Sequence, residues 1–273
     1  MSQDVIKLYI GADPNNCDLE QMMVADYSLK KHSSLPIDIT WLRLSRAHTS
    51  PFYGWRTETW TTSFSGLRWA APALAGGHGR AIYLDPDTIA LADIAELWRI
   101  PFQPGKIIIA KGGTGWRYCV SVFDCRAVSE LLGPMDVFKA NPNSHRDTIK
   151  YFLTHPALVQ EFPMGKQWNY CDNENLEQIN DPSVKIVHYT AIDTQPSARY
   201  AIPRLAAEGR RHWYNGPVNE HPRREITALF DRYYEEALAA GYSIEKYRRV
   251  PFGEFKKADL SGYSGAKERS PTA

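Results

Sequence analysis

The amino-acid sequence predicts an α/β fold in which a central sheet is flanked by helices and followed by a helical C-terminal portion. Apolar residues make up 43% of the 273 residues, which suffices for a full hydrophobic core. Short runs of apolar, β-branched and aromatic residues alternate with segments of helical period. The first three segments, residues 5–11, 19–32 and 37–44, have the order strand, helix, strand, which predicts a right-handed βαβ unit.

The remaining elements are predicted from the same spacing of apolar residues, which differs between helices and strands, and from the glycines and prolines that interrupt it. Residues 45–62 contain Pro51, Gly54 and several aromatic side chains, so we expect an irregular loop there. Residues 89–98 predict a loop and a short helix, with Asp93 as the N-cap. Further helices are expected over residues 64–74, 126–138, 144–154 and 222–240, and further strands over residues 81–84, 106–110, 118–123 and 184–189.

The charge balance narrows the class of partner. With 32 basic and 31 acidic residues the formal net charge is +1, which argues against a nucleic-acid-binding protein that relies on a strong basic field. Residues 201–273 carry a small excess of basic side chains. A solvated helix face explains that excess, and peripheral contact with an anionic membrane surface is the alternative.

The cysteines and the N-terminus indicate in which cellular compartment the protein is expected. Cys17, Cys119, Cys125 and Cys171 form no CxxC pair, so we expect neither a zinc site nor a disulfide framework, and a reducing compartment fits better. The N-terminus lacks the apolar run of a signal peptide, and no segment approaches the roughly 18 apolar residues of a spanning helix. The sequence therefore predicts a soluble, cytoplasmic protein.

The most informative segment is the apolar run 81–84 followed by Asp85-Pro86-Asp87. Ligands of an open α/β sheet bind at the carboxyl ends of its strands, where this segment is expected to lie. Two neighbouring carboxylates repel each other unless a cation lies between them, and such oxygen ligands suit Mg²⁺ or Mn²⁺, ions that hold phosphates. The segment therefore indicates a divalent ion that carries a diphosphate, and the alternative is a solvated turn.

Three other residues are candidates for the same site. His188 follows an apolar strand and could join the two carboxylates on Mn²⁺, although a lone histidine at such a place is more often structural. Arg68 could bind a phosphate through its fork of donors, or could be a surface arginine. Asp13 ends the first strand and could contact a nucleobase or ribose, or serve the turn before Pro14.

Several segments, in their order along the chain, carry a resemblance to a known family. They are Phe64-Ser65-Gly66-Leu67-Arg68-Trp69, Gly79-Arg80-Ala81-Ile82-Tyr83-Leu84-Asp85-Pro86-Asp87, Asp93-Ile94-Ala95-Glu96-Leu97-Trp98, Tyr118-Cys119-Val120-Ser121-Val122-Phe123-Asp124, Trp168-Asn169 and His188-Tyr189-Thr190. On the basis of these segments, residues 5–200 resemble the glycosyltransferases of the GT-A fold. The similarity is greatest to glycosyltransferase family 8, the group of glycogenins and bacterial lipopolysaccharide galactosyltransferases.

The resemblance implies a Rossmann-like, mixed central sheet in a nucleotide-sugar-binding catalytic domain over residues 1–200. Residues 201–257 would pack on it as a helical extension, and residues 258–273, rich in Ser, Gly and Lys, would form a disordered tail. The family uses a nucleotide-diphospho-sugar donor, usually UDP-linked, with Mn²⁺, and retains the donor's anomeric configuration. Mg²⁺ is the alternative ion.

The same resemblance assigns roles to individual residues. Asp85, Asp87 and His188 would hold the ion, with Asp85 also facing the donor. Asp13 would match the residue near the uracil, and Arg68 the arginine near the donor phosphates.

The sequence departs from the family pattern at three places. Gln195 stands where the family has a lysine that touches the diphosphate, and Cys119-Val120-Ser121 stands where members carry an Asn-x-Gly segment at the donor sugar. The family's Asp-Gln pair near the reacting carbon has no clean match. Asp147 stands in about the right place, and Asp172 is a second candidate catalytic carboxylate.

We therefore predict a metal-dependent, hexosyltransferase-like glycosyltransferase that acts on a hydroxyl group of a glycan, a lipid-linked glycan or a protein. Residues 213–216 and the following helix are the expected acceptor side. Two alternatives stay open. One is a non-catalytic sugar-nucleotide-binding protein, because the lysine is lost. The other is a sugar-1-phosphate nucleotidyltransferase, whose glycine-rich loop with Arg and Lys is missing from residues 12–16.

Overall fold

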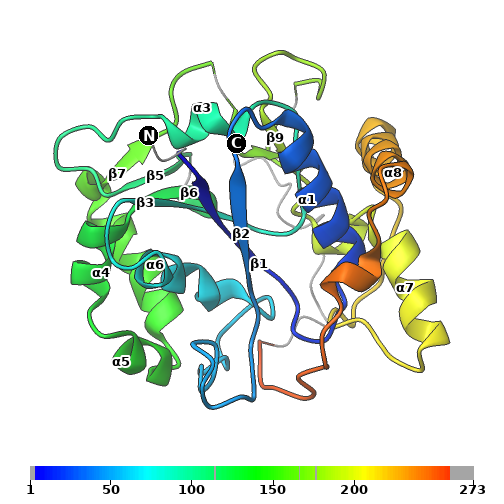
Figure 1. Ribbon diagram of the computed structural model, residues 1–273, viewed down its shortest axis with the longest axis horizontal. Helices are drawn as coiled ribbons and strands as arrows, with labels where there is room; N and C mark the ends of the chain where they lie inside the picture. The colour runs from blue at the N-terminus through cyan, green and yellow to red at the C-terminus, as the bar shows by residue number, and fades with distance from the viewer. Residues whose placement is uncertain (1–3, 114, 166, 176, 259–273) are drawn as a thin grey trace, which may run out of the picture.

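The computed structural model describes residues 4–258, apart from residues 114, 166 and 176. Within these residues the chain forms a six-stranded central sheet with helices on both faces (Figure 1). The strands lie in the order β2-β1-β3-β6-β5-β7. Their bounds are β1 Ile6–Gly11, β2 Ile37–Leu42, β3 Arg80–Leu84, β5 Ile108–Lys111, β6 Arg117–Asp124 and β7 Val159–Glu161.

The sheet is mixed because one strand runs against the others, as predicted. β1 pairs in parallel with β2 and β3, and β5 pairs in parallel with β7. β6 pairs antiparallel with β3 and with β5. This reversal brings the beginning of β6 to the edge where β3 ends, so that Asp85 N donates to Cys119 O at 2.8 Å.

The two faces of the sheet bury two apolar clusters. In β3, Ala81 and Tyr83 pack into one cluster, whereas Ile82 and Leu84 pack into the other, as expected for side chains that alternate along a strand. Helices α2, α4, α5 and α6 cover the first cluster, and α1 and α3 cover the second. These helices are α1 Leu19–His32, α2 Ala71–Leu74, α3 Ile94–Trp98, α4 Cys125–Leu132, α5 Met135–Ala140 and α6 Ser144–Thr154.

A second, smaller sheet continues from the end of β3. It consists of β4 (Thr88–Ala90), β8 (Tyr170–Cys171) and β9 (Ile186–His188). β9 is the middle strand, antiparallel to β4 and parallel to β8. The segment Asp85-Pro86-Asp87 is therefore the link between the two sheets.

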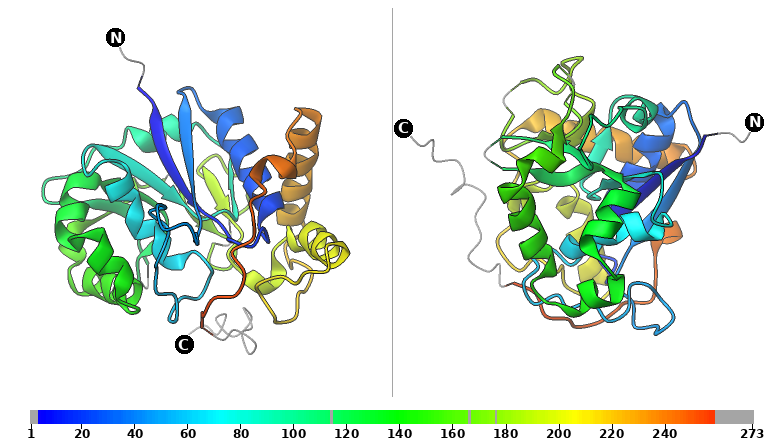
Figure 2. Two further views of the ribbon diagram at one scale, coloured as in Figure 1. Left: turned by 60° about the horizontal axis from the view of Figure 1, so that its bottom comes forward. Right: turned by 90° about the vertical axis from the view of Figure 1, so that its left-hand side faces the viewer.

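The C-terminal portion packs against α1 and the end of β1. Helices α7 (Ala198–Ala207) and α8 (Arg224–Ala239) lie on the α1 side of the molecule (Figure 1). The ring of the buried Phe230 in α8 lies 5.7 Å from the ring of Tyr189, next to the end of β9. The chain then returns to the end of β1, where Phe252 N donates to Pro14 O (Figure 2).

Most predicted elements are confirmed, and the differences have local causes. The helix over 19–32 and the cap at Asp93 are confirmed. A single helix over 126–138 is wrong, because Gly133, at φ 72°, and Pro134 separate α4 from α5. The predicted helix over 64–74 is divided too, into a 3₁₀ helix over Ser65–Ala70 and the short α2.

Among the strands and α-helices of the described residues, four were not predicted. β4, β7 and β8 have two or three residues each, too few for a period to be visible, and α7 contains Pro203. The predicted disordered tail, from residue 259 on, lies outside the described residues. In the part of the chain that the structure describes, no helix combines the length and apolar character needed to cross a bilayer.

Candidate functional site

Asp85 lies at the edge where β3 ends, in contact with two groups that both stabilise its ionised form. The Tyr83 hydroxyl donates to its Oδ1 at 2.6 Å, and Arg68 Nη2 lies 3.3 Å from the same oxygen. Arg68 is fixed in turn, because its Nε donates to Ser65 O at 2.9 Å. Burial raises the pKa of Asp85 to about 6, although Arg68 opposes the shift. A further positive charge at this edge would therefore stabilise the ionised carboxylate.

Asp87 and His188 meet through the small sheet. The register of β4 on β9 places Thr88 opposite His188, and Tyr189 N donates to Asp87 O at 3.2 Å. As a result His188 Nε2 lies 3.1 Å from Asp87 Oδ1. Burial by itself lowers the pKa of His188, but the neighbouring Cys119 and Asp87 raise it well above its usual range. The imidazole thus holds a proton that a cation bound at Nε2 would displace.

The second oxygen of Asp87 is held by a chain of neutral amides. Gln195 Nε2 donates to Asp87 Oδ2 at 2.8 Å. Gln21 Nε2 of α1 lies 2.8 Å from Gln195 Oε1 and 2.7 Å from Ser197 Oγ. Gln195 therefore touches the predicted metal site directly, at the place where the resemblance had a lysine, but it brings no charge.

Asn169 connects His188 to Cys119. Its Oδ1 lies 2.9 Å from His188 Nδ1, and its Nδ2 lies 3.3 Å from Cys119 Sγ. Because Oδ1 only accepts, Nδ1 of the imidazole carries a proton. A hydrogen bond from Cys171, together with His188 and Arg68, holds the pKa of Cys119 well below its usual value despite its burial.

The donor groups fit a divalent cation. Ligand atoms of Asp85, Cys119 and His188 lie within 4.8 Å of one another, and all three residues are buried. Carboxylate oxygen and imidazole nitrogen are ligands that Mn²⁺ accepts. Asp87 lies outside this group of three but contacts His188, so the structure brings the predicted Asp85, Asp87 and His188 to one place.

These side chains line a cavity of about 360 Å³. Aromatic walls are supplied by Trp116, Tyr118 and Trp213. Trp213 comes from the C-terminal portion, and its Nε1 lies 3.3 Å from Asp18 Oδ1, another residue of the lining. Five residues predicted for donor or ion binding are among those that line the cavity: Arg68, Asp85, Asp87, His188 and Gln195.

The other predicted carboxylates are not among the residues that line this cavity. Asp13 is fully buried, and its Oδ1 accepts from Asn15 N and Cys17 N in the turn after β1. Asp172 is also buried, with Oδ2 2.7 Å from His221 Nε2 and Oδ1 accepting from Thr190 N. Asp147 lies in the first turn of α6 with 56% of its side chain exposed, and it lines a different, shallow cavity.

Sequence reasoning missed part of the site. Asp18 and Gln21, at the start of α1, were not singled out, although both line the cavity. Asn169 and Cys119 were quoted only as parts of motifs. The antiparallel direction of β6, which places Cys119 beside Asp85, has no signal in a single sequence.

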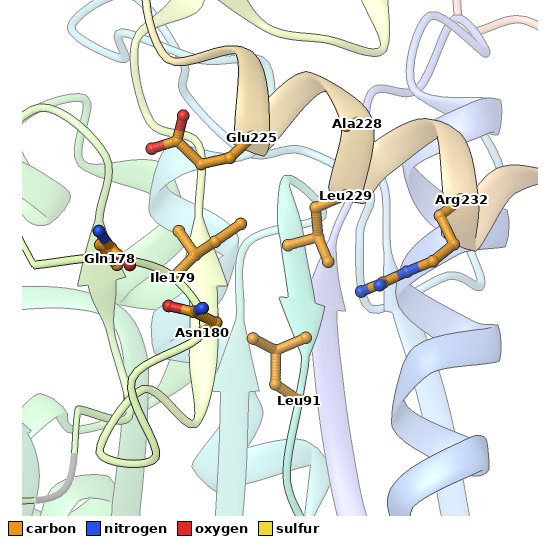
Figure 3. Close-up of a pocket in the computed structure, with 8 residues that line it drawn as sticks. All are labelled: Leu91, Gln178, Ile179, Asn180, Glu225, Ala228, Leu229 and Arg232. Carbon is orange, nitrogen blue, oxygen red and sulfur yellow. The ribbon is translucent and has the colours of Figure 1, made fainter.

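A larger cavity of about 760 Å³ lies between α8 and the segment before β9 (Figure 3). Leu91, Ile179 and Leu229 supply apolar lining, and Glu225 and Arg232 supply charge. None of the residues predicted for catalysis, donor binding or ion binding is among those that line it, although α8, which supplies one wall, is the helix predicted for the acceptor side. The smaller cavity is therefore the candidate site, because it alone combines the carboxylates, the imidazole and the buried arginine among the described residues.

Comparison with solved structures shows the class of fold. The galactosyltransferase LgtC, solved with donor and acceptor sugar analogs, matches with a TM-score of 0.54 and 11% identity over 89% of this chain and 99% of that chain. GlyE of Streptococcus pneumoniae TIGR4 matches with a TM-score of 0.54 and 13% identity over 90% of this chain and 66% of that one. The bifunctional glycosyltransferase WbbM matches with a TM-score of 0.50 and 15% identity over 72% of this chain and 47% of that chain.

These comparisons confirm the predicted GT-A-type fold. The chain spans less than two thirds of the length of WbbM and of GlyE. Protein CDI of Arabidopsis thaliana is 36% identical over an alignment of 203 residues, and the alignment covers 67% of this chain and 77% of that protein. The chain therefore belongs to the family of Protein CDI. No model of a protein family matches it.

Proposed function

We propose that this protein is a metal-dependent glycosyltransferase that moves a sugar from a nucleotide-diphospho-sugar, UDP-linked, to a hydroxyl group of an acceptor. The observation that carries the proposal is the group of Asp85, Asp87 and His188 beside the buried Arg68, in one cavity of a GT-A-type fold. The proposal places the chain near glycosyltransferase family 8 and includes retention of the anomeric configuration.

Each side chain has a role in the proposal. Asp85, Asp87 and His188 would hold Mn²⁺ or Mg²⁺, which supplies Lewis-acid stabilisation to a departing diphosphate when bound. Arg68 adds a fixed positive charge in a buried place, where it stabilises developing negative charge most strongly. Gln195 donates to Asp87 and orients it without adding charge. Asp13, through the turn that precedes Asp18, would support the nucleoside end of the donor.

The proposed chemical step needs no carboxylate nucleophile. The acceptor oxygen forms a bond to the anomeric carbon on the face from which the diphosphate leaves. The bond between that carbon and the diphosphate oxygen breaks, and the acceptor's proton passes to the departing phosphate oxygen. A covalent route would use Asp172 or Asp147 instead. Asp172 contacts the lining of the cavity, because its Oδ1 accepts from Thr190 N.

The division of labour along the chain is part of the proposal. Residues 1–200 would bind the donor, and residues 201–257 would supply the acceptor side, since Trp213 reaches the wall of the cavity. An aromatic side chain at that place suits the apolar face of a sugar. The acceptor would be a glycan, a lipid-linked glycan or a protein, with peripheral membrane contact in the lipid-linked case. The four cysteines are free thiols, which supports a cytoplasmic location.

The test is the release of free UDP or GDP from a panel of sugar nucleotides in the presence of Mn²⁺. We expect turnover of at least one donor, with kcat/KM about 100-fold lower in Asp87→Asn. Asp136→Asn, a matched variant at a carboxylate that is 88% exposed, should keep full activity.

Two other outcomes would contradict the proposal. Binding of sugar nucleotides without turnover of any donor indicates the non-catalytic alternative. Pyrophosphate-dependent cleavage of the donor indicates a nucleotidyltransferase.

A further inference from the structure

The thiol of Cys119 lies among the atoms that face the proposed ion. Its Sγ, an oxygen of Asp85 and a ring nitrogen of His188 are mutually within 4.8 Å. Cys119 is 8% exposed, so its thiol is shielded from bulk water. Asp87 lies outside this group and has both oxygens in hydrogen bonds with protein groups, one from His188 and one from Gln195.

The fold fixes Cys119 in this place. In the antiparallel pair β3–β6, Leu84 is opposite Val120, so the residue after the first and the residue before the second lie side by side. Asp85 N donates to Cys119 O at 2.8 Å, which ties the two residues together by their backbones. The sulfur therefore belongs to the same rigid edge of the sheet as the carboxylate.

One amide orients both the sulfur and the imidazole. Asn169 accepts from His188 Nδ1 at 2.9 Å and approaches Cys119 Sγ with its Nδ2 at 3.3 Å. Such a partner fixes the ring so that Nε2 is the nitrogen left for a metal. A side-chain amide that holds two potential ligands at once is the arrangement expected of a prepared metal site.

The second thiol of this region, that of Cys171, hydrogen-bonds to Cys119 and contacts the same amide. Cys171 Sγ is 3.5 Å from Asn169 Oδ1 and 3.7 Å from Asn169 O. Cys171 is not part of the group of three whose ligand atoms converge. Cys119 and Cys171 thus form a natural pair of test and control residues.

We propose that Cys119 is a ligand of the divalent ion, together with Asp85 and His188, and that the site therefore prefers thiophilic ions such as Co²⁺ or Zn²⁺ to Mg²⁺. A thiolate is a soft ligand, and a hard ion such as Mg²⁺ prefers oxygen. This differs from the expectation drawn from cysteine spacing, because the ligands here come from three separate strand ends. The inference deepens the proposed function, since it names a ligand of the ion on which that function depends.

The experiment adds Co²⁺ alone to the full chain and records its absorption spectrum. We expect the visible bands of bound cobalt and a near-ultraviolet charge-transfer band from sulfur to cobalt. In Cys119→Ser the charge-transfer band should vanish, and competition should show the preference for Zn²⁺ over Mg²⁺ falling about tenfold or more. Cys171→Ser and the distant Cys125→Ser should keep the band.

The result that overturns the inference is cobalt bound with no charge-transfer band, or with a band that survives Cys119→Ser. Absence of any cobalt binding also overturns it. A failure here is distinguishable from failure of the proposed function, because donor turnover with Mn²⁺ is measured separately. If Cys119→Ser does not fold, X-ray absorption of the zinc-loaded wild type decides, since a zinc–sulfur distance of about 2.3 Å requires a cysteine ligand.

Discussion

At the scale of single residues, the site combines groups whose charges depend on one another. Asp85 faces Arg68 and the Tyr83 hydroxyl, whereas Asp87 faces an imidazole and a neutral amide. These two carboxylates are separated by one proline, yet different elements supply their partners. A cation bound among these groups would replace protons that the site now holds.

Asn169 offers the first prediction at this scale. Asn169→Ala removes the amide that orients His188 and contacts Cys119, so the affinity for Mn²⁺ should fall about 10- to 100-fold. Calorimetric titration with Mn²⁺ measures this affinity. Asn180→Ala, at an exposed asparagine, serves as the control and should bind as the wild type does. Equal affinity in both variants would show that Asn169 does not position a metal ligand.

Gln195 offers the second prediction. Gln195→Lys brings an ammonium group next to Asp87, at the edge where a diphosphate would bind. A charge-assisted hydrogen bond to phosphate should lower the Kd of UDP in the presence of Mn²⁺ about tenfold, equivalent to about 1.4 kcal/mol. Gln178→Lys, on the exposed segment before β9, is the matched control. Unchanged or weaker UDP binding in Gln195→Lys would place the diphosphate elsewhere.

At the scale of elements, buried ion pairs and hydrogen bonds tie helix α1 to the C-terminal segment. Asp26 of α1 is the clearest example. Lys30 Nζ lies 2.6 Å from its Oδ1, and Tyr247 and Lys246 donate to its Oδ2 at 2.6 and 3.0 Å. Burial alone would raise the pKa of Asp26, but the bonds from Lys30, Tyr247 and Lys246 lower it below its usual value.

The lowered pKa of Asp26 makes the stability of the folded protein depend on pH. Because the pKa is lower in the folded state, Asp26 contributes stability above the ordinary aspartate pKa of about 3.9 and loses it as the pH falls below that value. Asp26→Asn should therefore destabilise the protein by about 1–2 kcal/mol at pH 7, and the difference from wild type should shrink towards pH 3. Urea unfolding at several pH values measures this, with Glu235→Gln as the exposed control. A difference that stays constant with pH would exclude the ionised carboxylate as the cause.

The elements also show which parts of the structure could be predicted from the sequence. Segments with a regular period and a clear terminus, such as 19–32 and the capped helix at Asp93, are predictable because local energetics decide them. The link Asp85-Pro86-Asp87 was predictable because a strand and two carboxylates occur together. The approach of His188 to Asp87 was expected from two strand ends that carry metal-ligand residues and from the resemblance. The pairing of the three-residue strands β4 and β9 that produces it is a long-range choice, which the sequence did not show.

At the scale of the whole molecule, the C-terminal portion completes a core that the first 200 residues begin. One apolar cluster contains Val24, Ile89 and Tyr189 from the first part and Ile226 and Phe230 from α8. Phe252 and Asn15 join the last described segment to the end of β1. The elements that position the site and those that cover it therefore share one interior.

This shared interior leads to a prediction about folding. The full chain should unfold in one cooperative thermal transition, and a chain of residues 1–200 should not give one, because it exposes that cluster. Circular dichroism during heating measures both. A chain of residues 1–200 that melts cooperatively and binds Mn²⁺ would contradict the prediction and would make the C-terminal portion an independent addition.

The most direct test of the account is the position of the ion itself. Crystals of the wild-type protein soaked in Mn²⁺ should give an anomalous-difference peak within ligand distance of Asp85 and His188, in the 360 Å³ cavity, and the peak should be lost in His188→Ala. A strong peak at another place, or none at these residues while Mn²⁺ still supports donor turnover, would contradict the account.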